Sequence, residues 1–365
     1  MKNIKYIIVA LFATAFAFTA YSQGCVSGGG DVVGVHGFIQ SEYNYYMNGT
    51  DANGKSLDQN TFNINRARLG VVGSIPYDVD YYVMIEYSPF TPQNKVHLLD
   101  GYVSYTRFSQ WAKISVGQFK SPFSLEQNTA CSGLYTVDRS EVVNQLAGPQ
   151  RDLGFVVNGG NDSTFVQYSV GMMNGSGMNV KDDNRFKDIV GRVVLSPLRS
   201  TGIDALKDLK LGGSFKYGKI NPTDNTQPLN EITRLGVELQ YKLHGFLLQS
   251  EYILGTDKLH SASQVPVFGG CGGIVGYETK SAGTYNKSGF WVIGSYMTPW
   301  NLEPTVKFDT YMADHAVTNS RTNRITVGLN YYINDYARLQ MNYINAQESA
   351  GIVNDRFVVQ LQAKF

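Results

Sequence analysis

Residues 79–88 read VDYYVMIEYS, and this stretch decides the fold class. Every second position holds an apolar or aromatic side chain: Val79, Tyr81, Val83, Ile85 and Tyr87. The positions between them are mostly polar, beginning with Asp80 and ending with Ser88. Successive side chains of a β-strand point to opposite faces, so this period of two predicts a strand with one apolar face and one wet face.

The same period recurs along the chain, for example in residues 66–73, 234–241 and 337–343. About sixteen such segments occur, each of about 8 to 14 residues. They begin near residues 35, 61, 79, 97, 111, 152, 163, 186, 208, 232, 246, 287, 302, 323, 336 and 355. A tilted strand needs about 9–11 residues to cross a bilayer, and bacterial barrels use even strand numbers. The count therefore predicts an all-β chain, a transmembrane antiparallel β-barrel of about 16 strands over residues 35–365.

The connections between these segments alternate between long and short. The long ones are residues 47–60, 89–96, 119–151 and 257–286. The short ones are residues 75–78, 108–110, 159–162, 244–245 and 299–301. Short periplasmic turns and long outer loops produce this rhythm in outer-membrane barrels, whereas a soluble β-sandwich has no reason for it. One connection, residues 197–207, is longer than the rhythm requires.

Aromatic positions and the chain end support the same interpretation. Tyr81 and Tyr87 lie at opposite ends of one face, where interfacial girdles belong. The last segment is apolar at every second position: Phe357, Val359, Leu361, Ala363 and Phe365. This ending resembles the signal that the barrel-insertion machinery reads, which Phe365 would carry. Because lipid cannot hydrogen-bond an open strand edge, the barrel must close, and sixteen strands enclose an aqueous channel.

The composition fits a barrel and excludes other classes. Aromatic residues make up 13% of the 365 residues and charged residues only 17%, with 24 Tyr and 38 Gly, which favours strands and turns over helices. Removal of Lys2 and Lys5 with a leader would leave 29 of the 31 basic residues against 30 acidic ones, a net charge of about −1. No basic block indicates a nucleic-acid partner.

The first residues predict secretion to the outer membrane of a Gram-negative cell. Lys2 and Lys5 precede an apolar stretch, and residues 20–22 form a small-x-small cleavage signal. We expect a signal peptide over residues 1–22 and a short N-terminal segment over 23–34. An N-terminal membrane anchor and a lipidated Cys25 are the alternatives.

Catalytic and metal-binding patterns do not emerge from the sequence. The five histidines are scattered without metal-ligand spacing, and no nucleophile elbow of the Gly-x-Ser-x-Gly type occurs. We therefore expect no enzyme activity, no cofactor and no metal. Three cysteines do not make a disulfide framework, but Cys131 and Cys271 both fall in long connections, and an oxidising compartment would allow them to pair.

Residues 117–154 carry a resemblance to a known family. The run GQFKSPFSLE at 117–126, Asp138-Arg139-Ser140 and Pro149-x-Arg151-x-x-Gly154 resemble segments of the phosphate-selective porin O/P family. The segments 66–70 and 328–332 are also similar to the family. The resemblance implies a sixteen-stranded homotrimer whose third external loop folds into the barrel and narrows it. Counting independently of the family, the connection 119–151 is the third long one, so we expect it to constrict the pore.

The resemblance also implies conduction of anions past basic side chains in the lumen. Strand parity places a set of cations on the wet face: Arg66, Arg68, Arg192, Lys210, Lys216, Arg234, Lys307 and Arg338. Lys120, Arg139 and Arg151 lie in or beside the constricting loop, where a charge would matter most. Guanidinium groups match oxyanion geometry, and rings of such side chains set pore selectivity.

Acidic residues on the same face leave an alternative open. They are Asp80, Glu86, Asp100, Asp188, Glu238, Glu251 and Asp309. Charges of both signs can pair across neighbouring strands and stiffen the wall without selecting ions. Three functions therefore remain: a general or weakly anion-preferring diffusion channel for small hydrophilic solutes, a phosphate-specific channel, and a non-conducting surface adhesin or accessory subunit with a plugged lumen. We expect the first.

Overall fold

A computed structural model describes residues 33–49, 55–88, 96–108, 110–182, 184–203, 205–224, 226–269, 273–348 and 354–365. The predicted signal peptide, residues 23–32 of the predicted N-terminal segment with Cys25, and Cys271 lie outside the described residues. The first strand begins at Val33, two residues before the predicted barrel start. No helix within these ranges is long and apolar enough to span a membrane. The described chain forms a closed antiparallel barrel, and the prediction of sixteen wall strands is confirmed.

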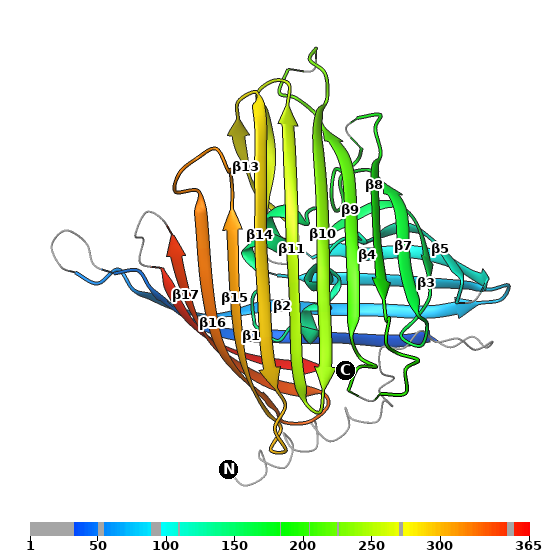
Figure 1. Cartoon of the computed structure of the whole chain (residues 1–365), viewed down its shortest axis with the longest axis vertical. Helices are drawn as coiled ribbons and strands as arrows, with labels where there is room; N and C mark the ends of the chain where they lie inside the picture. The colour runs from blue at the N-terminus through cyan, green and yellow to red at the C-terminus, as the bar shows by residue number, and fades with distance from the viewer. Residues whose placement is uncertain are drawn as a thin grey trace, which may run out of the picture.

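The wall strands follow one another in chain order. They are β1 (Val33–Met47), β2 (Gln59–Ile75), β3 (Val79–Tyr87), β4 (His97–Phe108), β5 (Ala112–Lys120), β6 (Arg151–Gly159), β7 (Val166–Met173), β8 (Asp188–Leu195), β9 (Lys210–Ile220), β10 (Asn230–Leu243), β11 (Phe246–Leu259), β14 (Gly283–Tyr296), β15 (Leu302–Met312), β16 (Arg321–Tyr332), β17 (Ala337–Glu348) and β18 (Asp355–Lys364). In Figure 1, β10, β11 and β14 run along the front, and β1 and β2 cross behind them.

The barrel closes between its first and last strands. Phe38 pairs with Lys364, and this register continues to Met47 and Asp355. Beyond the strand itself, Gly37 and Phe365 exchange two backbone hydrogen bonds, both of 3.0 Å. The terminal residue therefore belongs to the seam that removes the last open edge.

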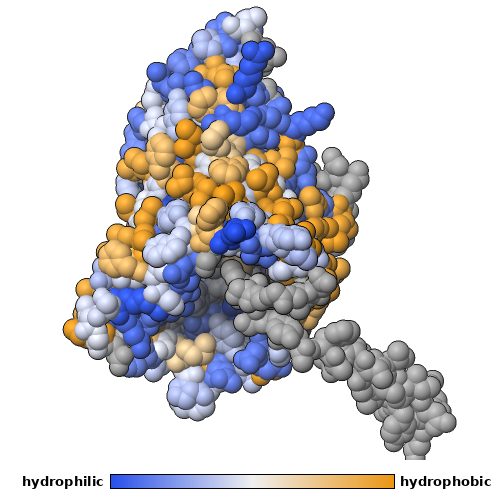
Figure 2. All heavy atoms as spheres, turned by 90° about the vertical axis from the view of Figure 1, so that its right-hand side faces the viewer, coloured by the Kyte–Doolittle hydropathy of each residue, from blue (hydrophilic) through white to orange (hydrophobic). Residues whose placement is uncertain are grey.

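Alternation of side chains sorts the wall into two faces. In β16, Ile325 and Val327 are exposed, whereas Thr326 and Asn330 are buried on the opposite face. Figure 2 shows apolar residues gathered in a band across one side of the barrel, with hydrophilic residues above and below it. The outer face is therefore apolar and the inner face polar, as a barrel in lipid requires.

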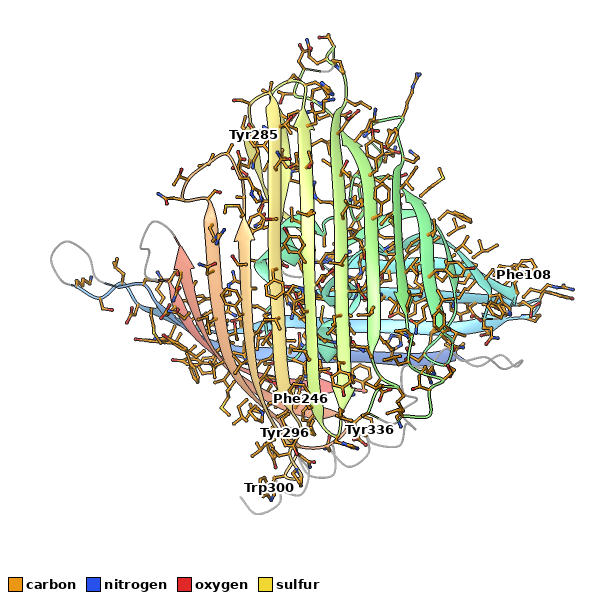
Figure 3. The ribbon with its side chains drawn as sticks, in the orientation of Figure 1. Phe108, Phe246, Tyr285, Tyr296, Trp300 and Tyr336 are labelled. Atoms are coloured by element: carbon orange, nitrogen blue, oxygen red, sulfur yellow. The ribbon has the colours of Figure 1, made fainter. Side chains whose placement is uncertain are left out.

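Aromatic side chains lie at the ends of the strands. Phe246, Tyr296, Trp300 and Tyr336 gather at one end of the barrel, and Tyr285 lies at the other end of β14 (Figure 3). The first four belong to or adjoin the short turns. These positions match the interfacial girdles expected of a membrane barrel.

A turn of two residues joins β10 to β11. His244 and Gly245 have φ values of 46° and 86°, so both adopt the left-handed conformation of a two-residue hairpin turn. Glycine adopts this conformation without a steric cost, which allows the chain to reverse within two residues. The connection 197–207, longer than the predicted rhythm, is also a long turn in the structure, from Ser196 to Leu209.

The connection predicted over residues 257–286 differs from the structure. β11 and β14 continue to pair until Leu259 meets Gly283, and a separate hairpin of β12 (Ser263–Gly269) and β13 (Gly273–Lys280) lies between them. Polar residues such as Asp257 and Lys287 end the apolar alternation before the pairing ends. The prediction therefore put the ends of the connection at residues 257 and 286, where the apolar alternation stops. The backbone pairing of β11 with β14 continues beyond those residues.

Replacement of Val327 by arginine should destabilise the barrel by about 2–4 kcal/mol, because a charge would face lipid near the middle of β16. Denaturant titration in lipid vesicles measures this free energy. Val317→Arg is the matched control, since Val317 is similarly exposed (54% against 52%) but lies in the connection after β15. Equal effects of the two substitutions would contradict the assignment of the outer face.

Candidate functional site

The candidate site is built around the connection from β5 to β6, residues 121–150, here called the β5–β6 loop. It contains α2 (Leu125–Asn128), a 3-10 turn (Cys131–Gly133) and α3 (Glu141–Leu146). Its hydrogen bonds and ion pairs reach inner-face side chains of β1, β9, β11 and β15 to β18. One loop thus contacts strands distributed widely around the barrel.

A buried ion pair anchors the middle of the loop. Lys307 of β15, 1% exposed, donates to Glu126 Oε1 at 3.1 Å and to the carbonyl of Asp138 at 2.8 Å. The other carboxylate oxygen of Glu126 accepts from the backbone N–H of Ser140 at 2.7 Å. Since removal of one partner would leave a buried charge unpaired, this contact holds the two helices of the loop to the wall.

Glu251 of β11 anchors the beginning of the loop. Its carboxylate accepts hydrogen bonds from Ser124 Oγ (2.9 Å), the Leu125 N–H (3.2 Å) and Trp291 Nε1 (3.1 Å). Ser124 Oγ in turn accepts from the Gln127 N–H and caps α2. A single buried acidic side chain therefore fixes both the helix start and a wall tryptophan.

Side chains of β16 and β17 hold the second part of the loop through hydrogen bonds to its backbone. Asn330 donates to the carbonyl of Tyr135 at 3.0 Å, and Asn342 accepts from the backbone N–H of Val137 at 2.7 Å. Arg338 donates to the carbonyls of Leu134 (3.0 Å) and Ser132 (3.1 Å). The extended backbone of the loop thus finds partners in the wall, as buried peptide groups require.

Apolar packing accompanies these hydrogen bonds. Val142 and Leu146 of α3 belong to a buried cluster with Ile253 and Trp291 of the wall. A Cβ atom at Gly289 would lie 2.4 Å from Val142 Cγ2, so the missing side chain leaves the recess that receives α3. The inner face is therefore apolar where the loop rests on it, although it is polar elsewhere.

The predicted residues Lys120, Arg139 and Arg151 lie at the base of this loop. Lys120 and Arg151 are directly paired in the register of β5 and β6. Lys120 Nζ donates to the carbonyls of Asn128 (3.3 Å) and Thr129 (3.0 Å). Arg139, 3% exposed, donates to the carbonyls of Glu126 and Thr129 and lies 3.5 Å from Cys131 Sγ. Three basic side chains thus lie close to one another at the base of the loop.

Four predicted arginines form ion pairs with wall carboxylates, and one of them is Arg234 of β10, which pairs with Asp257 of β11. Arg151 binds Asp100 through two hydrogen bonds of 3.0 and 3.1 Å. Arg192 binds Glu238 in the same two-pronged way, at 2.9 and 2.5 Å. Arg68 pairs with Glu86 on the adjacent strand. These contacts match the alternative interpretation of the sequence, in which charges pair along the wall.

Three predicted lysines also pair with carboxylates: Lys216 with Asp188, Lys210 with Asp162, and Lys307 with Glu126. Arg66 donates to Gln40 Oε1 at 2.8 Å, and Arg338 contacts loop carbonyls as described. Cys131 is buried in the loop, and its proposed partner Cys271 lies outside the described residues. Among the described residues, no group of three His, Cys, Asp or Glu side chains is placed to hold a metal ion.

Sequence reasoning missed the residues that hold the loop by neutral contacts. Asn330 and Asn342 are polar residues whose partners are backbone groups far along the chain, and Ser124 bonds the distant side chain of Glu251. Strand parity could have placed Asn330 and Asn342 on the inner face. No sequence signal identifies Trp291 or Gly289 as the seat of α3, because that contact depends on the loop conformation.

Asp138 is the acidic end of a second loop anchor. It accepts a hydrogen bond of 2.6 Å from Arg356 of β18. Burial raises the pKa of Asp138, but attraction by Arg356 and Arg324 outweighs burial and holds the pKa below its usual range. The carboxylate is therefore ionised at neutral pH and pairs with Arg356.

The comparison with known families decides the identity. The family described as phosphate-selective porin O and P matches residues 33–232 and 221–363. The chain belongs to this porin family. It is an outer-membrane channel that crosses the membrane with its strands. A search of curated proteins finds no significant match.

Solved porins share the fold at low sequence identity. The outer membrane channel DcaP of Acinetobacter baumannii is 15% identical, with a TM-score of 0.65 and coverage of 94% of this chain and 99% of its own. An anion-selective porin from Comamonas acidovorans is 13% identical, with a TM-score of 0.62 and coverage of 92% and 100%. The trimer form of OmpT from Vibrio cholerae is 10% identical, with a TM-score of 0.61 and coverage of 92% and 100%.

Replacement of Lys307 by methionine should release the β5–β6 loop locally, because Glu126 would remain buried without its cation. We expect a loss of about 3 kcal/mol, or roughly a hundredfold faster amide hydrogen exchange across α2 and α3. Hydrogen exchange read by mass spectrometry on the folded protein measures this.

The double variant Glu126→Gln with Lys307→Met should recover most of the protection, since both charges are gone. Lys210→Met is the control, because its pair with Asp162 lies at an exposed turn. Exchange in the loop that does not change in Lys307→Met would show that the ion pair does not anchor it.

Acidification should weaken the contact between Asp138 and Arg356. Because the pKa of Asp138 is lowered in the folded chain, its contribution to stability is present above about pH 4 and is lost as the pH falls through the folded pKa. Asp138→Asn should be less stable than the wild type at neutral pH and should converge with it in acid. Denaturant titrations across this range measure the difference, and a constant difference would contradict the pairing.

Proposed function

We propose that this porin is a passive diffusion channel for small hydrophilic solutes with a weak preference for anions, and that the β5–β6 loop lies in the lumen and narrows it. The observation that carries the proposal is the set of contacts from this one loop to inner-face residues such as Gln40 of β1, Glu251 of β11 and Arg338 of β17. A loop held by strands this far apart around the wall would pass through the space that they enclose.

Two cations support the anion preference. Lys120 and Arg338 donate to backbone carbonyls of the loop, which carry no formal charge to balance them. In contrast, the charges of Arg68, Arg151 and Arg192 are balanced by carboxylates. We therefore assign the main field on passing anions to Lys120 and Arg338, with Arg139 beside Lys120 contributing to it.

The structural neighbours support the anion preference and a trimeric assembly by analogy. One structural neighbour is an anion-selective porin, and another was solved in a trimer form. We infer that this chain also forms a homotrimer in the lipid of the outer membrane. We further infer that the insertion machinery reads Phe365, whose side chain is exposed at the end of β18, together with the exposed Phe357 and Leu361.

The test is the reversal potential of single channels in a planar bilayer under a potassium chloride gradient. The wild type should show a steady current with a reversal potential on the anion side. Lys120→Gln or Arg338→Gln should lower the ratio of chloride to potassium permeability by about two- to fourfold, since one charge is removed from the pore.

Lys364→Gln is the matched control, because Lys364 is an exposed residue at the end of β18 and should not change the ratio. A steady current without selectivity would remove the anion preference but keep the channel. Absence of current from correctly folded protein would favour the non-conducting surface protein.

A further inference from the structure

Four aromatic rings form a continuous row on the inner face of β1, β3, β4 and β5. His36 stacks on Tyr82 with ring centres 5.4 Å apart and planes at 20°. Tyr82 contacts Tyr102 at 5.3 Å, and Tyr102 contacts the edge of Phe119 at 5.9 Å. We call these four residues the aromatic row. None of them carries a charge that the anion preference uses.

A glycine makes the row continuous across β2. The register pairs His36 with Gly70 and Gly70 with Met84, so β2 separates the histidine from β3. A Cβ atom at Gly70 would lie 2.8 Å from His36 Nε2 and 3.1 Å from Met84 Cε. The missing side chain lets the imidazole reach across the strand and bond the Tyr82 hydroxyl at 2.9 Å. The contact between His36 and Tyr82 therefore depends on residues of three strands, β1, β2 and β3.

Ion pairs with hydrogen-bonding capacity flank the row. Asp100, Arg151 and Arg68 all lie close enough to Tyr82 to act on it electrostatically. Arg151 bonds Asp100 through Nε and Nη2, and its remaining terminal nitrogen, Nη1, has no hydrogen-bond partner among the described residues. Each pair is neutral as a unit, and the side chains of Arg68, Asp100 and Arg151 are buried.

The rings of His36, Tyr82 and Tyr102 remain partly exposed, whereas Phe119 is buried behind them. Contact between water and a partly exposed aromatic surface is unfavourable in free energy. A solute with an apolar face would displace this water and lower the free energy. The faces of aromatic rings are electron-rich, so they do not attract anions such as phosphate. The row therefore suits a neutral solute.

We propose that the aromatic row binds the pyranose rings of neutral sugars on their way through the pore. The axial C–H groups of a pyranose form an apolar face that can lie on the partly exposed rings of Tyr82 and Tyr102. This site extends the proposed diffusion channel from small anions to a class of uncharged solute. Passage of the sugar depends on that channel, but binding to the row does not.

The test measures maltotriose on wild-type protein in two ways. Added sugar should interrupt the potassium chloride current of single channels in a concentration-dependent manner, and calorimetry in detergent should detect binding without any need for conduction. Sorbitol, a linear polyol without a rigid ring face, and inorganic phosphate are the comparison solutes. Maltotriose should bind at least about tenfold more tightly than sorbitol.

Tyr82→Ala and Tyr102→Ala should each weaken maltotriose binding by about three- to tenfold, while Tyr82→Phe and Tyr102→Phe should keep most of it because the ring remains. Tyr343→Ala is the control, since Tyr343 is exposed on the outer face of β17. The phenylalanine variants and the solute comparison do not depend on whether the alanine variants fold.

Absence of maltotriose binding by calorimetry would overturn the inference, as would equal responses to sorbitol or a tighter response to phosphate. If the current is absent but calorimetry detects the sugar with this variant pattern, the channel proposal fails and the sugar site stands. If the current is steady but insensitive to maltotriose, and calorimetry is silent, the channel stands and the sugar site fails.

Discussion

The need to pair every backbone edge in a medium without hydrogen-bonding partners determines the rest of this structure. Lipid offers no donors or acceptors, so an open sheet cannot persist there. The bonds between Gly37 and Phe365 complete the ring of strands and remove the last edge. Once the ring is closed, every wall side chain faces either lipid or the interior, and the period of two in the sequence follows from that division.

Closure also shapes the interior. A ring of sixteen strands is too wide for wall side chains to fill, so the inner face needs a second layer of structure or water. In our proposal the β5–β6 loop supplies such a layer. It is attached in three chemically different ways: a buried ion pair at Lys307, hydrogen bonds to its backbone from Asn330 and Arg338, and apolar packing at Gly289. Their combination explains why both charged and apolar residues occur on one nominally wet face.

The sequence was sufficient for the wall and insufficient for the interior. Strand number and phase follow from a local period, so the segments beginning at residues 79 and 302 were placed correctly from their own residues. The β12–β13 hairpin was not predicted, because it follows strands that continue pairing after the apolar alternation ends. Which charges pair was equally inaccessible. Arg192 reaches Glu238 across β9, and only coordinates reveal that two strands on either side of a third share an ion pair.

The attachment of the β5–β6 loop has a consequence for the order of assembly. Val137 is 205 residues from its partner Asn342, and Ser132 is 230 residues from Gln362. Contacts of such long sequence separation form late, because the chain between them must first be ordered. The loop cannot settle until β14 to β18 exist. With the loop in the lumen as proposed, each molecule would pass through a stage with a complete wall and a wide interior, and its final permeability would be set by the last step of its own folding.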